Sequence, residues 1–344
     1  MNVTTRMDGN NAWAQGFRRM LAGVAGAGVL LASGAAAAAQ DVKVNEVLRS
    51  LFYAPQYVAL KIGAFEKEGL NISSLKTTWG TQATITEIVS GGSNIALLGP
   101  EAAAMTQGAD PARRLVNFAM LANRDGSFII AKKPMPDFKI TDLKGKTIVT
   151  GGAGSTPYLA LVSLIQQAGL DPKKDVNIRS IPISANIIPS FLEGGADFAQ
   201  AFEPAVTMAI TETGAHRVAS VGVLLGEIPY TAYAAPASYI EKNPAVIQSF
   251  ANAIQKGLDW THAHSAKEVA EAIAPHFKDI PLATIETVIS EYKKIDAWPK
   301  HINLPEDGMN KALDLLVNGG VLKQRVAYKD IVDPRFAAKV APGK

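Results

Sequence analysis

The sequence predicts an α/β protein built from two similar lobes that face each other across a cleft. Short apolar runs alternate with segments of helical periodicity, as expected for parallel βαβ units. The segment 90–102 resembles the segment 193–205 at a constant offset of 103 residues, and a Pro-rich stretch at 132–137 separates the two runs. Ligand crevices in open α/β sheets lie at the carboxyl ends of strands, so the repeat predicts a cleft between the lobes. The alternative is that the two segments are alike by coincidence, because Gly and Pro commonly stand at the ends of helices and strands in α/β chains.

The individual elements follow from apolar spacing and from Gly and Pro stops. In the first run we expect strands over 42–49, 71–78 and 95–98, with helices over 57–69, over 82–90 and from 101 onward. In the second run we expect strands over 147–150, 176–182 and 197–201, with helices over 158–169, over 187–193 and after 204. The C-terminal block is expected to be mostly helical, over 243–264, 266–277, 281–295 and 306–319.

These elements suggest a discontinuous first lobe. We expect residues 40–130 and 235–344 to form the first lobe with its C-terminal helices, and residues 131–234 to form the second. Two crossovers then join the lobes. One is expected in the Pro-rich stretch and the other near 229–233.

The first forty residues have the three parts of a secretory signal. Arg18-Arg19 supplies positive charge, 20–34 is uncharged, and 35–39 ends in small residues, so residues 1–39 are expected to be removed by cleavage after about Ala39. A membrane anchor is the alternative, but the stretch is short and rich in Ala and Gly. The arginine pair leaves the export route open between the general secretory and the twin-arginine machinery.

The amino-acid composition further limits which kind of exported protein this is. The sequence has no cysteine, so we expect no disulfide, no thiol nucleophile and no lipid-modified cysteine at the cleavage point. A soluble exported protein without an anchor is retained by an outer membrane, so the expected location is the periplasm. Residues 1–39 carry three arginines and one aspartate, so their removal lowers the formal net charge from +3 to +1. Such a balance predicts no nucleic-acid partner.

Motifs for catalysis or cofactor binding are weak. The five histidines lack metal-ligand spacing, and the Gly-rich turn 151–154 lacks both the Lys-Ser/Thr of a P-loop and the glycine spacing of a dinucleotide fingerprint. We therefore expect no cofactor and no metal. We interpret the turn as a helix N-terminus that offers N–H groups, with the Ser155 and Thr156 hydroxyls, to a polar ligand. A simple capping turn is the alternative.

The expected ligand site is formed by the turns that follow the strands. Single aromatic residues at such turns usually cap the core, but together they suggest a cleft that stacks on a flat ligand. Glu101 and Glu203 either accept N–H groups of the ligand or only stabilise the positive ends of their own helices, and Arg124 would compensate them if the ligand were anionic. The expected ligand-binding residues are Ser50, Leu51, Phe52, Tyr53, Trp79, Gly80, Pro100, Glu101, Arg124, Gly154, Ser155, Thr156, Glu203 and Tyr230.

Several motifs along the mature chain resemble the nitrate/sulfonate/taurine and thiamine-precursor class of periplasmic solute-binding proteins. The first motif is the segment 47–64 with the Phe65-Glu66-Lys67-Glu68-Gly69-Leu70 that follows it. The other three are the segment 90–95, Asp142-Leu143-Lys144-Gly145-Lys146, and Gly194-Gly195-Ala196-Asp197. The resemblance implies a type II periplasmic binding protein fold. It also implies delivery of a small-molecule solute to an ABC permease in the inner membrane. The class spans small anions, sulfonates, aromatic acids and pyrimidines, so the solute stays open.

Three functions therefore compete. The leading expectation is a monomeric binding protein, not an enzyme, that closes two lobes on a small polar organic solute. The second is a secreted enzyme of the same fold that uses a cleft carboxylate as a base. The related pyrimidine synthase of fungi depends on a cysteine-rich motif, which this chain lacks. The third is a sensory protein that hands its ligand to a receptor.

Overall fold

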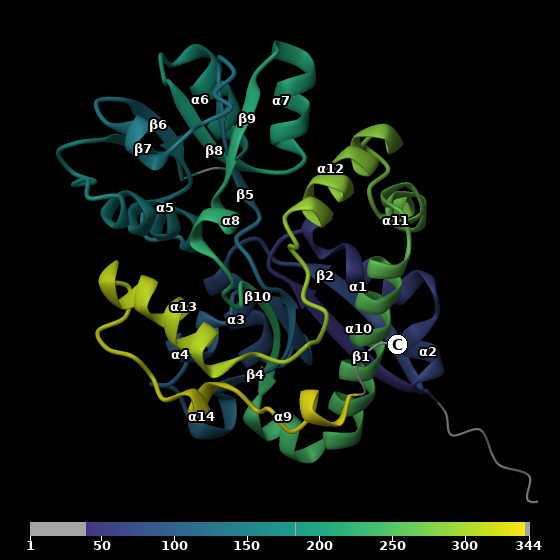
Figure 1. Ribbon diagram of the computed structural model, residues 1–344. Coiled ribbons are helices and arrows are strands. Elements are labelled where there is room, and N and C mark those ends of the chain that lie inside the picture. Colours follow the sequence, from purple (N-terminus) through teal and green to yellow (C-terminus); the bar gives the residue numbers. More distant parts are fainter. Residues whose placement is uncertain (1–38, 183, 341–344) are drawn as a thin grey trace, which may run out of the picture. The chain divides into compact units, whose positions relative to one another are not determined.

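The computed structural model of the protein describes residues 39–182 and 184–340, so the predicted signal segment lies almost wholly outside the described residues. Within these residues ten strands form two five-stranded sheets (Figure 1). The first sheet has the order β2-β1-β3-β10-β4, with β1 (Gln40–Glu46), β2 (Leu70–Thr77), β3 (Ile95–Leu98), β4 (Leu115–Ala122) and β10 (Thr231–Pro236). The second has the order β7-β6-β8-β5-β9, with β5 (Ser127–Ala131), β6 (Thr147–Thr150), β7 (Asn177–Ser180), β8 (Phe198–Phe202) and β9 (His216–Ser220).

The two sheets share one arrangement of strand directions. In the first, β1 runs parallel to β2 and β3, whereas β10 is antiparallel to β3 and β4. In the second, β6 runs parallel to β7 and β8, whereas β5 is antiparallel to β8 and β9. The central strands β3 and β8 begin at Ile95 and Phe198, which is the offset of the sequence repeat. The prediction of two similar α/β lobes is confirmed.

The chain passes between the sheets twice, but the first crossover lies earlier than expected. It occupies residues 123–126, between β4 and β5, and the second occupies 226–230, before β10. The predicted boundary at residue 131 is wrong because the apolar segment Ser127–Ala131 pairs with β8 and β9. The Pro-rich stretch 132–137 is therefore a loop inside the second lobe. The predicted return at residue 234 falls inside β10, so that boundary is also a few residues late.

Helices cover both sheets and form most of the C-terminal block. The first lobe contains η1 (Leu51–Tyr53), α1 (Ala54–Lys61), α2 (Ala64–Lys67), α3 (Thr81–Val89), α4 (Glu101–Met105), η2 (Pro111–Arg113) and α9 (Ala237–Lys242). The second contains η3 (Ile140–Leu143), α5 (Thr156–Gln167), η4 (Ser184–Asn186), α6 (Ile187–Glu193), α7 (Ala205–Thr213) and α8 (Val221–Leu225). The C-terminal block contains α10 (Pro244–Ala263), α11 (Ala266–Ile273), η5 (Ala274–His276), α12 (Leu282–Lys294), α13 (Glu306–Asn318), α14 (Tyr328–Ile331) and η6 (Ala337–Lys339).

The helix expected over 57–69 is two shorter helices. Gly63 has φ 65°, in the left-handed region that ends a helix, so α1 stops before it and α2 starts after it. The long helix α10 packs directly on α1 at Gly257. A Cβ atom at Gly257 would lie 2.3 Å from the Pro55 carbonyl oxygen, so glycine is required for this close approach.

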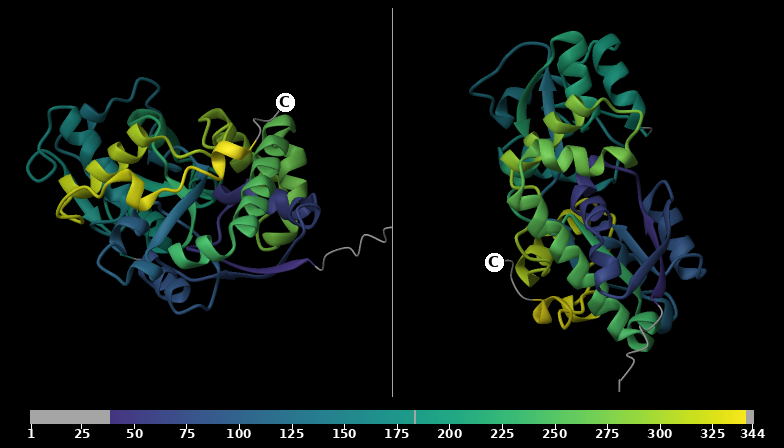
Figure 2. Two further views of the ribbon diagram at one scale, coloured as in Figure 1. Left: turned by 90° about the horizontal axis from the view of Figure 1, so that it is seen from below. Right: turned by 90° about the vertical axis from the view of Figure 1, so that its right-hand side faces the viewer.

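One apolar core runs continuously through both lobes. It includes Phe52 and Tyr57 from the first lobe, Phe128 and Phe191 from the second, and Tyr292 from α12. Figure 2 shows the C-terminal helices, coloured green to yellow, alongside both sheets. None of the helices in the described part of the chain is long and apolar enough to cross a membrane.

Candidate functional site

The carboxyl ends of the strands in both sheets are linked by one hydrogen bond between helix N-termini. Glu101 opens α4 directly after β3, and Thr156 opens α5 after β6. The Thr156 hydroxyl donates to Glu101 Oε1 at 3.0 Å, so it joins the second lobe to the first. Gly99 makes room for this arrangement, because a Cβ atom there would lie 2.3 Å from the carboxylate oxygens of Glu101.

Glu101 is a buried carboxylate with no cation beside it. Its exposed fraction is 9%, and burial raises the pKa of its carboxyl above the usual value, although its own backbone N–H and the Thr156 hydroxyl act in the opposite direction. No ion pair to Glu101 occurs among residues 39–182 and 184–340. The positive end of α5 faces this carboxylate through Thr156, which offsets part of the desolvation.

A second buried carboxylate, Asp125, lies in the first crossover. Its Oδ1 accepts hydrogen bonds from the Ser127 N–H at 2.7 Å and from the Ser127 hydroxyl at 2.5 Å. The Ser127 hydroxyl in turn accepts from Gln200 Nε2 at 2.9 Å, and Gln200 Oε1 accepts from the Thr150 hydroxyl at 2.6 Å. Burial raises the pKa of Asp125. This chain of hydrogen bonds fixes Asp125 relative to the second sheet.

Two buried polar atoms beside this network have no hydrogen-bond partner among the described residues. They are Asp125 Oδ2 and the Tyr292 hydroxyl. Burial raises the pKa of Tyr292, the negative charges of Glu203 and Asp125 raise it further, and the backbone of Glu203 acts in the opposite direction. Burial raises the pKa of Tyr230, and the charge of the neighbouring Asp125 and a side-chain contact with it raise this pKa further. Buried polar groups normally have partners, so these atoms suggest a site for a polar ligand or water.

Aromatic rings surround the carboxylates. The Phe52 ring lies 6.2 Å from Tyr53, 6.0 Å from Tyr230, 6.5 Å from Phe202 and 5.0 Å from Tyr292, measured between ring centroids. Burial raises the pKa of Tyr53, with a further contribution from the charges of Glu46 and Glu101. The rings come from both lobes and from α12, so the carboxylates lie in a largely apolar surrounding.

Other predicted residues support the site through their backbone or lie next to it. The Ser50 hydroxyl accepts from the Phe52 N–H at 3.1 Å and so caps η1, and Leu51 is fully buried. The Pro100 carbonyl accepts from Asn117 Nδ2, which holds the start of α4. Gly154 has φ +84°, and the Ser155 hydroxyl oxygen before α5 is buried without a partner in the described structure.

Four predicted residues lie elsewhere or are already occupied. Trp79 has an exposed fraction of 73%, so it is a surface residue, and its neighbour Gly80 uses its N–H to bond the Val47 carbonyl in a turn. Both oxygens of Glu203 are occupied, by the Thr207 N–H at 2.8 Å and by Arg217 at 2.5 Å. Arg124 pairs with Glu227 at 3.1 Å across the two crossovers. These contacts use both oxygens of Glu203, whereas Arg124 keeps a buried Nε without a hydrogen-bond partner among the described residues.

The structure adds residues that sequence reasoning did not identify. Asp125, Ser127, Gln200 and Tyr292 belong to the buried polar group, yet none was predicted. Asp125 adjoins the predicted residue Arg124 in the sequence, but no pattern there distinguishes the carboxylate from a surface aspartate. No sequence pattern marks Tyr292 as a site residue, because its position depends on how α12 packs against both lobes.

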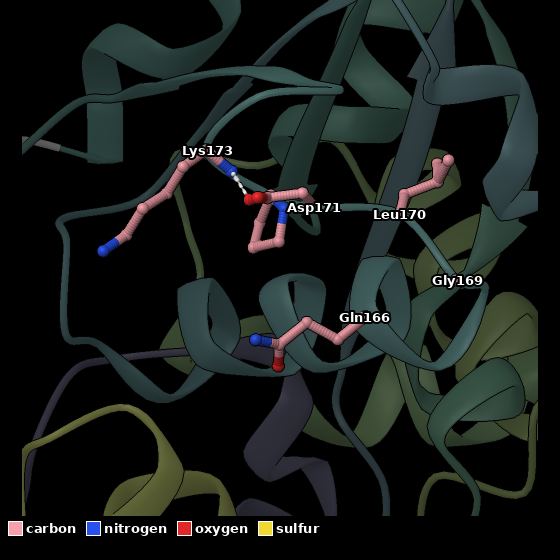
Figure 3. A pocket seen from close by; sticks show the side chains of 6 residues that line it. Gln166, Gly169, Leu170, Asp171 and Lys173 are labelled. Carbon is pink, nitrogen blue, oxygen red and sulfur yellow. Dashed lines mark hydrogen bonds between the residues drawn. The ribbon is translucent and has the colours of Figure 1, made fainter.

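Two hollows in the described structure are lined by residues other than the predicted ones. Figure 3 shows the first, about 590 Å³, beside the loop after α5, where the Asp171 carboxylate accepts the Lys173 N–H at 2.9 Å. The second, about 640 Å³, is lined by Asn123 and 227–229 of the crossovers together with residues of the C-terminal block. No group of His, Cys, Asp and Glu suited to hold a metal ion occurs in the described residues.

Comparison with known proteins identifies the family. The model of the NMT1-like family matches residues 46–274, which is more than half of the chain. This chain belongs to the NMT1-like family. It is also 35% identical over 303 residues to "Putative binding protein YtlA" of Bacillus subtilis (strain 168), over 88% of this chain and 90% of that protein. The family resemblance expected from the sequence is confirmed.

Solved structures confirm the fold. The periplasmic aliphatic sulphonate binding protein SsuA from Escherichia coli superposes with a TM-score of 0.66 at 18% identity, covering 84% of this chain and 96% of that one. The desulfurization enzyme DSZB has a TM-score of 0.62 at 13% identity, covering 87% and 98%. The NMT1-like chain therefore has the periplasmic binding protein fold, which both a binding protein and an enzyme use.

Proposed function

We propose that this protein is the solute-binding component of an ABC import system and that it closes its two lobes on a planar organic solute carrying N–H donors. The observation that carries this proposal is Glu101, a buried carboxylate without a cation that hydrogen-bonds the opposite lobe through Thr156 at 3.0 Å. A ligand that touches both lobes of a hinged protein shifts the balance toward the closed form. The family and the binding-protein name of its relative YtlA support a binding role.

Charge favours a solute with N–H donors over an anion. Glu101 and Asp125 are both buried acceptors, and the nearby Arg124 is directed to Glu227. Sites for sulfonates or carboxylates generally supply Arg, Lys or free N–H groups at helix N-termini. Here a carboxylate of the protein already faces the N-terminus of α5. A second negative charge would therefore be repelled in a poorly hydrated surrounding.

The aromatic rings favour a flat solute. Phe52, Tyr53, Phe202 and Tyr230 offer apolar faces and edges near the two carboxylates. A planar heterocycle gains from stacking or edge contacts with such rings, and its ring N–H or amino group satisfies the acceptors. An amino-substituted pyrimidine has this combination of a flat ring and donors, which is why it serves as our first probe.

Location and delivery are part of the same proposal. The predicted signal segment and the fold shared with periplasmic proteins support a periplasmic carrier that docks on an inner-membrane permease. A thermal-shift screen of the mature protein with 4-aminopyrimidine, benzoate, ethanesulfonate and nitrate tests the solute class. A ligand that binds only the folded state raises the melting temperature, so we expect a rise with 4-aminopyrimidine alone. A rise with ethanesulfonate or nitrate alone would contradict the proposal.

One observation favours an enzyme as the second candidate. Burial raises the pKa of both Glu101 and Asp125, and carboxyl groups with raised pKa values in a cleft are typical of general acids and bases. The fold of DSZB is compatible with this alternative. Mass spectrometry of the probe after long incubation distinguishes the two roles. A carrier returns 4-aminopyrimidine unchanged, whereas an enzyme converts it or a related solute.

A further inference from the structure

We propose that α12 is a wedge between the lobes and that the ion pair between Arg217 and Glu291 is the latch that keeps them closed. Arg217 lies in β9 of the second lobe and Glu291 lies in α12. This inference rests on the proposed function, because a latch has a role only in a protein that opens and closes around a solute. Both are positioning residues, since neither needs to touch the solute.

Helix α12 belongs with the first lobe but also contacts the second. It packs mainly against α11, which packs against α1, and it contacts η1 next to the site. It also contacts α7 of the second lobe, which lies next to it in Figure 1. The Tyr292 ring is fully buried between the two lobes, with its centroid 5.0 Å from that of Phe52 and 6.2 Å from that of Phe128. Opening of the hinge must therefore separate part of the second lobe from α12.

The ion pair crosses this boundary in a shielded position. Arg217 Nη1 lies 3.1 Å from Glu291 Oε2, and the guanidinium lies 4.8 Å from the centroid of the Phe128 ring. The two side chains are 20% and 16% exposed. Partial burial reduces the screening by water, so this pair contributes more than a fully exposed surface pair.

Each latch residue keeps a second partner within its own side of the boundary. Arg217 Nη2 also bonds Glu203 Oε1 at 2.5 Å, and Lys294 Nζ bonds Glu291 Oε1 at 2.7 Å. When the latch separates, neither Arg217 nor Glu291 is left as an unpaired charge. This limits the penalty of opening, which is usually large when one charge of a buried pair loses its partner. The arrangement is therefore suited to repeated opening and closing.

The test measures the distance between the lobes without any solute. The chain has no cysteine, so spin labels attach only to cysteines introduced at exposed Gln82 of the first lobe and exposed Lys133 of the second. We expect Glu291→Gln to shift the distance distribution from the closed toward the open form, by about 2- to 5-fold in the ratio of the two populations. Glu286→Gln is the matched control, because it removes the same charge from the same helix without touching Arg217.

A second variant keeps the test decisive if Glu291→Gln is poorly folded. Glu291→Asp keeps the charge of this side chain but shortens it by one methylene group, which moves the carboxylate away from Arg217 Nη1, 3.1 Å away in the wild type. It should also shift the distribution toward the open form, whereas Glu286→Asp should not. Equal distributions for the wild type and Glu291→Gln, or equal shifts in the Glu286 and Glu291 variants, would overturn the latch. Because no solute is present, failure of this test is separate from failure of the proposed solute class.

Discussion

Replacement of Glu101 by Gln should change stability and solute affinity in opposite directions. The substitution keeps the size of the side chain and an oxygen that still accepts from Thr156 at 3.0 Å, but it removes the charge. The wild-type carboxylate is buried without an ion-pair partner in the described residues, and burial raises its pKa. An unpaired buried charge destabilises the fold, so Glu101→Gln should raise the free energy of unfolding at pH 7 by about 1–2 kcal/mol.

The increase in the free energy of unfolding caused by Glu101→Gln should depend on pH. A carboxyl whose pKa is raised on folding contributes stability below its ordinary pKa of 4.5, and that contribution is lost as the pH rises through the raised value. The difference between Glu101→Gln and the wild type should therefore be largest at pH 7 and should shrink toward pH 4.5. Urea denaturation at several pH values measures it directly.

Affinity should fall in the same variant. A hydrogen bond from a solute N–H to a carboxylate contributes about 1.5–3 kcal/mol, so titration calorimetry with 4-aminopyrimidine should show a loss of about 10- to 100-fold. Glu203→Gln is the matched control, because both oxygens of Glu203 are used by Arg217 and Thr207. It should lower stability by about 1–3 kcal/mol and leave affinity nearly unchanged. Unchanged affinity in Glu101→Gln, or tighter binding of ethanesulfonate by it, would refute the assignment.

Three further predictions concern the surroundings of the site. Trp79→Ala should change the free energy of unfolding by less than about 0.5 kcal/mol, because the side chain is 73% exposed, and a loss above about 2 kcal/mol in urea denaturation would contradict its position. Phe52→Ala should lower that free energy by about 3–5 kcal/mol, since the ring is almost fully buried among aromatic neighbours, and a change below 1 kcal/mol would argue against the packing. Gly222→Ala should lower it by about 1–3 kcal/mol, because the new Cβ would lie 2.2 Å from the Asp125 carbonyl oxygen, whereas Gly108→Ala, with open space around it, should not.

The fold was predictable because its signals are local and repeated. The apolar run at 95–98 and its counterpart near 198 gave the two central strands, and the helices α10, α12 and α13 match their predicted ranges within two residues. The position of β5 was not predictable in the same way. Its pairing with β8 and β9 depends on contacts with residues about 70 to 90 positions later, and the prolines that follow it have the composition of a linker although they lie inside the second lobe.

The sequence brought predicted site residues together only where chain position alone determined their place, and their contact with a solute stays a prediction. Phe52, Tyr53, Glu101 and Thr156 follow strands, and strand ends of the two sheets meet in this fold. Glu203 occupies the equivalent place in the second lobe, but Arg217, fourteen residues later, neutralises it. No sequence pattern shows which of two glutamates receives a cation from another strand. The same limit applies to Trp79, whose exposure depends on what packs over its turn.

The most direct test of the central claim compares two flat ligands of equal size and opposite edge chemistry. Benzamidine presents N–H donors and a positive charge, whereas benzoate presents a carboxylate on the same ring. Titration calorimetry of the wild-type mature protein at pH 7 should detect binding of benzamidine and none of benzoate, because Glu101 and Asp125 are buried acceptors without a cation. Tighter binding of benzoate than of benzamidine would contradict a site built around these two carboxylates.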